Sequence, residues 1–171
     1  PRLLENRGRR LRIWSAACST GDEPYTIAMI LQKYLPKMQY EIIATDIDDQ
    51  VLDKAANGLY HAKSISGVPD EYMQFFEQIS NDTYQISDKI MNMVKFKQHN
   101  LLKDPYITGC DLIVCRNVLI YFTDEAKDEI FMKFNKVLNK NGILFIGNTE
   151  QILTPKVFGF TTIKSFFYTK E

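Results

Sequence analysis

The 171-residue sequence has no apolar run long enough to cross a bilayer, no excess of either charge, and only three cysteines and two histidines. Without such a run it predicts no membrane-spanning helix, and we expect neither a signal peptide nor insertion into a membrane. The 21 basic and 21 acidic residues cancel to a formal net charge of zero. Balanced charge disfavours nonspecific electrostatic binding of nucleic acid, so we expect no nucleic-acid partner.

The scarce cysteines and histidines limit the chemistry further. Cys18, Cys110 and Cys115 form no Cys-x-x-Cys pair. Their spacing predicts neither a metal site nor a disulfide framework and is typical of a protein in the reducing cytoplasm. Neither His61 nor His99 is paired with a nucleophile in the sequence, which disfavours a catalytic triad. We expect both histidines to be structural and no metal to be bound.

What the sequence does contain is a loop of small residues between an expected strand and an expected helix. The strand covers 12–17, the loop Cys-Ser-Thr-Gly-Asp-Glu follows it, and a helix begins near Pro24. Small side chains let a ligand approach the backbone, and the N–H groups at a helix start can bind its polar atoms. The next expected strand, 40–45, ends at Asp46. This succession is the layout of a nucleoside-binding α/β half-domain.

Alternating strands and helices continue along the chain and predict one α/β domain with a mostly parallel sheet. The expected strands after the first two are 94–99, 111–115 and 143–146, the expected helices after the first are 49–57 and one that starts at Thr123, and the expected turn before the last strand is Asn141-Gly142. The segments 160–163 and 166–169 predict a closing antiparallel pair. In the first helix, the 3.6-residue spacing predicts one sheet-packing stripe, made of Ile27, Ile30, Leu31, Tyr34 and Leu35.

Residues 60–93 interrupt the alternation. Pro69 is placed to start a short helix, and Asn81-Asp82 lies between two short β-prone runs, which is a hairpin signal. We interpret 60–93 as a small β-rich subdomain inserted into the main domain.

The loop is poor in glycine, and this bears on which nucleoside it binds. A dinucleotide fingerprint needs three glycines, whereas this loop has only Gly21 and carries Asp22 and Glu23. Carboxylates repel a pyrophosphate but suit an ammonium group, so the residues favour S-adenosylmethionine. Asp46 is expected to accept both ribose hydroxyls; the alternative is a turn or helix-capping residue. The nearby Asp48 and Asp49 are interpreted as helix-start residues.

Four segments carry a resemblance to a known family. They are Ile13-Trp-Ser-Ala-Ala-Cys-Ser-Thr-Gly-Asp-Glu-Pro-Tyr, Ala44-Thr-Asp-Ile-Asp, Asn100-Leu-Leu and Cys115-Arg-Asn-Val-Leu-Ile-Tyr-Phe. In order and spacing they resemble the chemotaxis receptor glutamate O-methyltransferases, the CheR family. The resemblance implies a class I S-adenosylmethionine-dependent methyltransferase fold. It also implies methyl transfer to glutamate carboxylates of chemotaxis receptors, with S-adenosylhomocysteine as the product.

The resemblance also implies roles for particular residues. The implied cofactor contacts are Ala17, Cys18, Glu23, Asp46, Asn100, Leu101, Cys115, Arg116 and Asn117. The implied catalytic residues are Tyr121, beside the transferred methyl, and Arg116. Asp22 departs from the glutamate of relatives. The family's amino-terminal helical domain and linker are absent from this chain, which we interpret as the catalytic domain alone.

A glutamate carboxylate is already anionic at neutral pH, so its methylation needs no general base. The site has to align the nucleophile and remove its water. Tyr121 suits the first task through its hydroxyl, and Arg116 could attract the acid. The alternatives are that Tyr121 is a core aromatic and that Arg116 is purely structural. The segment lacks the Asn/Asp-Pro-Pro-Tyr motif of enzymes that methylate base amino groups.

Two other functions remain open: a cofactor-binding sensor without catalysis, and a nicotinamide-dependent oxidoreductase. Under the favoured interpretation the protein is a cytoplasmic monomer. Its partners are the cytoplasmic domains of membrane chemoreceptors, which dock through 60–93.

Overall fold

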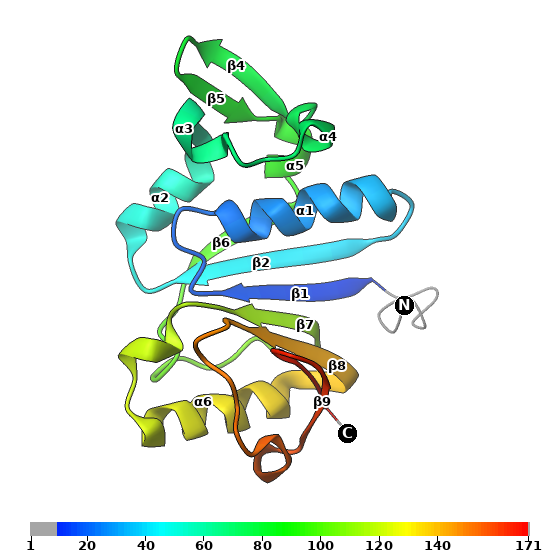
Figure 1. Ribbon diagram of the computed structural model, residues 1–171, viewed down its shortest axis with the longest axis vertical. Helices are drawn as coiled ribbons and strands as arrows, with labels where there is room; N and C mark the ends of the chain where they lie inside the picture. The colour runs from blue at the N-terminus through cyan, green and yellow to red at the C-terminus, as the bar shows by residue number, and fades with distance from the viewer. Residues whose placement is uncertain (1–9, 171) are drawn as a thin grey trace.

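The computed structural model describes residues 10–170, and its centre is a seven-stranded sheet with strand order β6-β2-β1-β7-β8-β10-β9 (Figure 1). Its strands are β1 (Leu11–Ala16), β2 (Tyr40–Asp46), β6 (Val94–Gln98), β7 (Cys110–Cys115), β8 (Leu138–Ile146), β9 (Phe160–Lys164) and β10 (Phe167–Lys170). The first five strands in spatial order pair in parallel, and β10 is antiparallel to both β8 and β9. The expected α/β class and the closing antiparallel pair are confirmed.

Helices cover both faces of this sheet because neighbouring residues of a strand point to opposite sides. Ile13 packs with α1 (Asp22–Tyr34), and Trp14 packs with α6 (Asp124–Val137) on the other face. Figure 1 shows these two helices on opposite sides of the strands. No helix within residues 10–170 combines the length and apolar character needed to cross a membrane.

The expected buried stripe of α1 is wrong over part of its length. The helix buries Tyr25, Ala28 and Met29 as well as Leu31, whereas Tyr34 is 61% exposed. The helix carries apolar residues on more than one face, so periodicity could not decide which face meets the sheet. The expected stripe residues Ile27 and Ile30 instead line the cavity described below.

The other helix boundaries follow local chemistry. The helix α2 (Asp49–Asn57) starts after Asp48, whose carboxylate accepts the Gln50 N–H at 2.8 Å, and ends at Gly58 in the left-handed region. Thr123 caps α6 by accepting the Ala126 N–H at 3.3 Å. These are the helix starts expected at Asp48 and Thr123, and α2 has the expected range, 49–57.

Asn141-Gly142 is not the expected turn between helix and strand. The helix α6 passes directly into β8, and the two residues lie inside that strand. Asn141 has a positive φ of 62°, and the pairing of β8 with β7 shifts register in this region. The turn-forming residues therefore make an irregularity in a strand, which lets β8 continue alongside β7.

The segment between α2 and β6 forms a second, three-stranded antiparallel sheet of order β3-β5-β4. Its elements are β3 (Leu59–His61), α3 (Ala62–Ile65), α4 (Asp70–Met73), β4 (Phe76–Ser80), β5 (Thr83–Ile86) and α5 (Asp88–Met91). The hairpin at Asn81-Asp82 lies where it was expected, but β3 is an unforeseen third strand. Tyr60, Ile86 and Ile90 join the hydrophobic cluster that includes α1, which fixes the base of the small sheet to the main domain.

Candidate cofactor and methyl-transfer site

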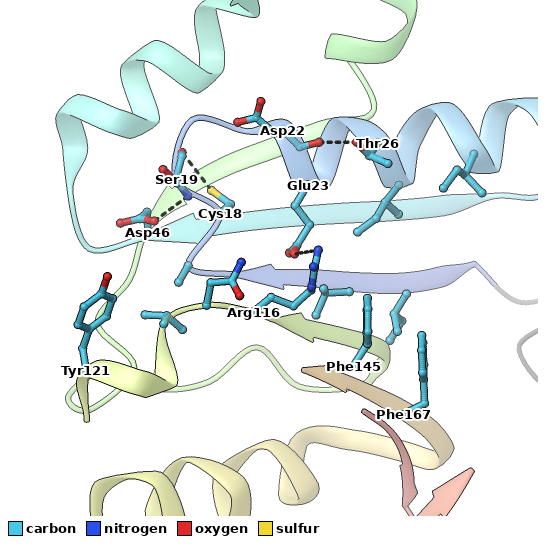
Figure 2. Close-up of a pocket in the computed structure, with 17 residues that line it drawn as sticks. Cys18, Ser19, Asp22, Glu23, Thr26, Asp46, Arg116, Tyr121, Phe145 and Phe167 are labelled. Atoms are coloured by element: carbon cyan, nitrogen blue, oxygen red, sulfur yellow. Dashed lines mark hydrogen bonds and ion pairs between the residues drawn. The ribbon is translucent and has the colours of Figure 1, made fainter. Parts of the chain in front are cut away.

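A cavity of about 780 Å³ opens beyond the carboxyl ends of β1 and β7 (Figure 2). These two strands are neighbours in the middle of the sheet, and the chain turns to opposite sides from them: β2 lies beyond β1, and β8 lies beyond β7. Ligands of open α/β sheets bind at such a switch point. The expected site residues that line the cavity are Ala17, Cys18, Glu23, Asp46, Arg116, Asn117 and Tyr121.

The loop between β1 and α1 brings backbone close to the cavity. Ala17 and Ser19 both have positive φ angles, and Gly21, at φ 87°, caps α1. A Cβ on Gly21 would lie 3.0 Å from the Ala55 Cβ and 3.2 Å from the Tyr25 ring. Glycine is therefore required here by both the backbone angle and the close approach of α2.

Asp46 is the half-buried acid at the tip of β2. Its Oδ2 accepts the Ser19 N–H at 2.8 Å, and its Oδ1 accepts the Asp48 N–H at 3.2 Å. A carboxylate has about four acceptor positions, so two remain for the hydroxyls of a ribose. Asp46 thus braces the loop and faces the cavity, while the capping role belongs to Asp48.

Glu23 lies deeper and faces a cation. It accepts the Ser15 hydroxyl at 2.7 Å and lies 3.8 Å from Nη1 of Arg116 (Figure 2). Burial raises the pKa of Glu23 above its ordinary value, and the Ser15 hydrogen bond and the Arg116 charge partly oppose this effect. An ammonium group placed beside Glu23 would stabilise its ionised form.

The raised pKa of Glu23 predicts that the affinity for S-adenosylhomocysteine falls as the pH is lowered from about 7 to about 5. Pairing with the ligand ammonium needs the carboxylate, so binding releases protons and tightens as the pH rises through the pKa of the free protein. Calorimetric titration across this range measures the slope. Glu23→Gln should bind more weakly at neutral pH and lose most of the slope; an unchanged slope would assign it to another group.

Aromatic rings form the apolar end of the cavity. Phe145 of β8 and Phe167 of β10 stack with ring centroids 4.1 Å apart and planes 4° apart. The Arg116 guanidinium lies 5.2 Å from the centre of the Phe145 ring. Arg116 therefore contacts both an acid and an aromatic face, which fits a positioning role as well as attraction of an anion.

Tyr121 is at the other end of the cavity, on the short 3₁₀ helix η2 (Leu119–Tyr121), as Figure 2 shows. The residue is 81% exposed, so the alternative that it is a core aromatic is wrong. The hydroxyl is free to meet a substrate that approaches from solvent.

Three expected cofactor residues do not line the cavity. Leu101 and Cys115 are buried in the hydrophobic cluster around Trp14. Asn100 shapes its own turn, since its Oδ1 accepts the Leu102 N–H at 2.9 Å. The residue before it, His99, donates its N–H to the Asp46 carbonyl at 2.8 Å, so the turn lies beside the acid.

The thiol and imidazole groups fit structural roles. Burial, reinforced by the Asp46 charge, raises the pKa of Cys18 to about 12, so its thiol is not a nucleophile at neutral pH. His99 is buried, with its ring 5.3 Å from that of Trp14, and His61 caps α3 by accepting the Lys63 N–H at 3.2 Å. Within residues 10–170 no three His, Cys, Asp or Glu side chains gather as metal ligands.

Sequence reasoning missed several residues of the site. Ser15 is fully buried and its hydroxyl holds Glu23; a polar residue inside an apolar strand was the available signal. Phe145 and Phe167 gave no signal, because they come from strands far from the loop in sequence. Glu150, which reaches the loop of Asn117, was also missed.

This strand order, with a cavity at its switch point and two acids in place of a pyrophosphate loop, defines a class I methyltransferase fold. Solved structures agree on the fold. An O-methyltransferase family 2 protein from Planctomyces limnophilus superposes with TM-score 0.54 at 18% identity, over 82% of this chain and 32% of its own. PKMT2 from Rickettsia typhi gives 0.52 at 22%, over 80% and 20%.

The family follows from sequence. The family model described as the CheR methyltransferase SAM-binding domain matches residues 1–167, and the chain belongs to this family. It is 45% identical to a chemotaxis protein methyltransferase of Listeria monocytogenes, over 99% of this chain and 65% of that protein. It is 39% identical to one of Borreliella burgdorferi, over 88% and 56%. The chain thus spans less than two thirds of these relatives, and its family makes S-adenosylmethionine the cofactor.

Proposed function

We propose that the protein transfers a methyl group from S-adenosylmethionine to glutamate side-chain carboxylates of chemotaxis receptors in the cytoplasm. The observation that carries this proposal is one cavity that holds Glu23 and Asp46 on its inner side and exposed Tyr121 at its rim. The relatives' names, chemotaxis protein methyltransferase, support the same pathway.

The donor set of the cavity fits the cofactor. Glu23 is placed for the ammonium of the methionine end, Asp46 for the ribose hydroxyls, and backbone of the loop Ala17–Ser19 for close approach. Asn100 and Leu101 follow the contact between His99 and Asp46, which supports an adenine-side position. When bound, S-adenosylmethionine supplies a methyl group attached to a sulfonium. The sulfonium sulfur is a good leaving group because it becomes a neutral thioether.

The remaining residues act on the methyl acceptor. A glutamate carboxylate that enters at the rim meets the Tyr121 hydroxyl first, which can orient one oxygen by donating a hydrogen bond. Arg116, already paired with Glu23, attracts the acid without holding both its oxygens. The apolar walls exclude water from the nucleophile. Cys115, the buried last residue of β7, precedes Arg116 in the chain and supports the end of the strand.

We expect S-adenosylhomocysteine to raise the melting temperature of the protein, because a ligand that binds only the native state stabilises it by mass action. NAD should leave the melting temperature unchanged, since the loop has a single glycine and two acids. Differential scanning fluorimetry with each ligand makes the comparison. A shift with NAD alone would favour the oxidoreductase, and a shift with S-adenosylhomocysteine but no methyl transfer to receptor would favour the sensor.

The small sheet is our proposed receptor-docking element. Its strand β4 lies at an edge, and Ile79 on that strand is 58% exposed. Figure 1 shows the β4–β5 hairpin at the end of the molecule remote from β9. An unpaired strand edge with an apolar side chain can add an extended peptide strand.

Ile79→Lys is expected to weaken receptor binding about tenfold or more, because burial of an isoleucine contributes about 1.5–3 kcal/mol. Calorimetric titration with the receptor's cytoplasmic domain measures this change. Ile163→Lys is the matched control, since Ile163 is exposed on β9 at the far edge of the main sheet. Unchanged receptor binding in Ile79→Lys, or a collapse of cofactor binding, would remove docking from this sheet.

A further inference from the structure

Glu150 is a buried acid outside the cavity that binds backbone on two sides of the site. Glu150 lies in the segment that follows β8, and the residue is only 7% exposed. Its Oε2 accepts the N–H of Asn117 at 2.8 Å and of Gly147 at 2.9 Å, and its Oε1 accepts the N–H of Leu119 at 2.6 Å. One carboxylate thus joins the segment after β8 to the loop after β7.

The surroundings are built for this contact. An ionised carboxylate can only accept hydrogen bonds, and here it meets three donors, which offset the cost of burying its charge. A Cβ on Gly147 would collide with Oε2 of Glu150 and lie 3.0 Å from Oδ1 of Asn117, so the Glu150 carboxylate can occupy this place only because residue 147 has no side chain. Asn117 itself has a positive φ of 60°. The loop therefore has a left-handed backbone conformation at Asn117, the residue whose N–H binds Glu150.

The loop after β7, whose backbone Glu150 binds, also contains Tyr121. Leu119 begins η2, and within the same turn the Tyr121 N–H donates to the Val118 carbonyl at 3.1 Å. Because Tyr121 is 81% exposed, few packing contacts fix its side chain, and the backbone of the loop sets where its hydroxyl lies. Any shift of Leu119 moves Tyr121 with it.

The pairing of β7 with β8 does not depend on Glu150. The strands β7 and β8 remain paired up to Cys115 and Ile146, just before the residues that Glu150 binds. Their register is therefore set by ladder hydrogen bonds and buried side chains, and the Glu150 contacts fall on the loops beyond. Loss of these contacts should alter the loop more than the sheet.

Resting on the proposed methyl transfer, we propose that Glu150 is a positioning residue that acts through the Asn117–Leu119 backbone to set Tyr121 at the cavity rim. Glu150 does not line the cavity, so its role is to position other residues. Its effect is on turnover, through the placement of the Tyr121 hydroxyl.

The test is Glu150→Gln in the full-length protein. Glutamine keeps the size but replaces one acceptor oxygen with an NH₂ group that faces backbone donors. We expect turnover per folded molecule to fall about tenfold to a hundredfold, as a misplacement of about 1 Å can cost a hundredfold. Affinity for S-adenosylhomocysteine should change much less. Glu125→Gln, the same change at an exposed position of α6, is the control and should retain full turnover.

A double-mutant cycle with Tyr121→Phe separates positioning from general support. If Glu150 acts through Tyr121, the double variant should be no slower than the slower single variant, whereas independent effects multiply. Multiplying effects would overturn the proposal. If Glu150→Gln does not fold, Gly147→Ala leaves Glu150 in place but displaces its carboxylate, and the same non-additivity with Tyr121→Phe is expected.

Amide hydrogen exchange supplies a readout that does not need activity. In Glu150→Gln the N–H groups of Asn117 and Leu119 should exchange faster, while those of β7 keep their protection. If the wild-type protein methylates no receptor, the proposed function is wrong. Hydrogen exchange would still test whether Glu150 holds the backbone of Asn117 and Leu119. Loop amides that stay protected, or wild-type turnover in Glu150→Gln, would overturn the positioning role.

Discussion

Replacing Asp46 with alanine is expected to weaken the binding of S-adenosylhomocysteine about tenfold to a hundredfold. Hydrogen bonds to charged groups contribute about 1.5–3 kcal/mol, and each 1.4 kcal/mol changes the affinity about tenfold. Asp46 also accepts the Ser19 N–H at 2.8 Å, so its loss removes a support of the loop as well as the proposed ribose contact. Isothermal titration calorimetry measures the change in Kd.

Two matched variants make the Asp46 result specific. Asp49→Ala removes an exposed acid three residues away, in the first turn of α2, and should leave the affinity unchanged. Asp46→Asn keeps the shape but removes the charge, and should fall between wild type and Asp46→Ala. A folded Asp46→Ala protein that binds as tightly as wild type would exclude Asp46 from the ribose site.

Tyr121→Phe should lower the turnover of receptor methylation about tenfold to a hundredfold, while S-adenosylhomocysteine binds almost as before. The change removes only a hydroxyl. Because Tyr121 is 81% exposed, the folded state should lose little stability, within about 0.5 kcal/mol. Steady-state kinetics with receptor substrate, together with a calorimetric Kd, separates the two quantities.

Tyr34→Phe is a suitable control for the loss of a tyrosine hydroxyl. Tyr34 is 61% exposed on the last turn of α1 and is not among the residues that line the cavity. Equal losses of turnover and cofactor affinity in Tyr121→Phe would assign Tyr121 to cofactor binding. Wild-type turnover would remove it from the chemistry.

The pairing of Glu23 with Arg116 has a consequence for the substrate acid. Arg116 lies 3.8 Å from Glu23 and over the Phe145 ring, so its charge is partly engaged before the proposed substrate, a receptor glutamate, arrives. A guanidinium that bound both carboxylate oxygens would keep their lone pairs from the methyl group. Its partial engagement therefore suits attraction better than capture.

Much of the fold could be predicted because it depends on local signals. The Asp48 cap, the Gly58 stop and the hairpin at Asn81-Asp82 each reflect hydrogen bonds or backbone angles within a few residues. The same holds for the loop before α1 and for Asp46 at the tip of β2, because the order of strand, loop and helix already brings them to one edge of a parallel sheet.

Other features depend on contacts between distant segments, and local patterns do not contain them. The face of α1 that packs on the sheet was mistaken because apolar residues lie around more than one side of it, and packing of Tyr25 and Ala28 decided the matter. Asn141-Gly142 favours a turn, but these residues lie inside β8, where pairing with β7 outweighed that tendency.

The sequence by itself determined the family, the cofactor class, and the position of Glu23 at the start of α1 and of Asp46 at the tip of β2, since these rest on short segments whose chemistry is local. Only the tertiary structure showed that Ser15 holds Glu23, that Phe145 stacks on Phe167, and that Glu150 grips the loop of Tyr121. These contacts join residues from different strands and loops. They exist only once the sheet has set the register and distance of its neighbouring strands.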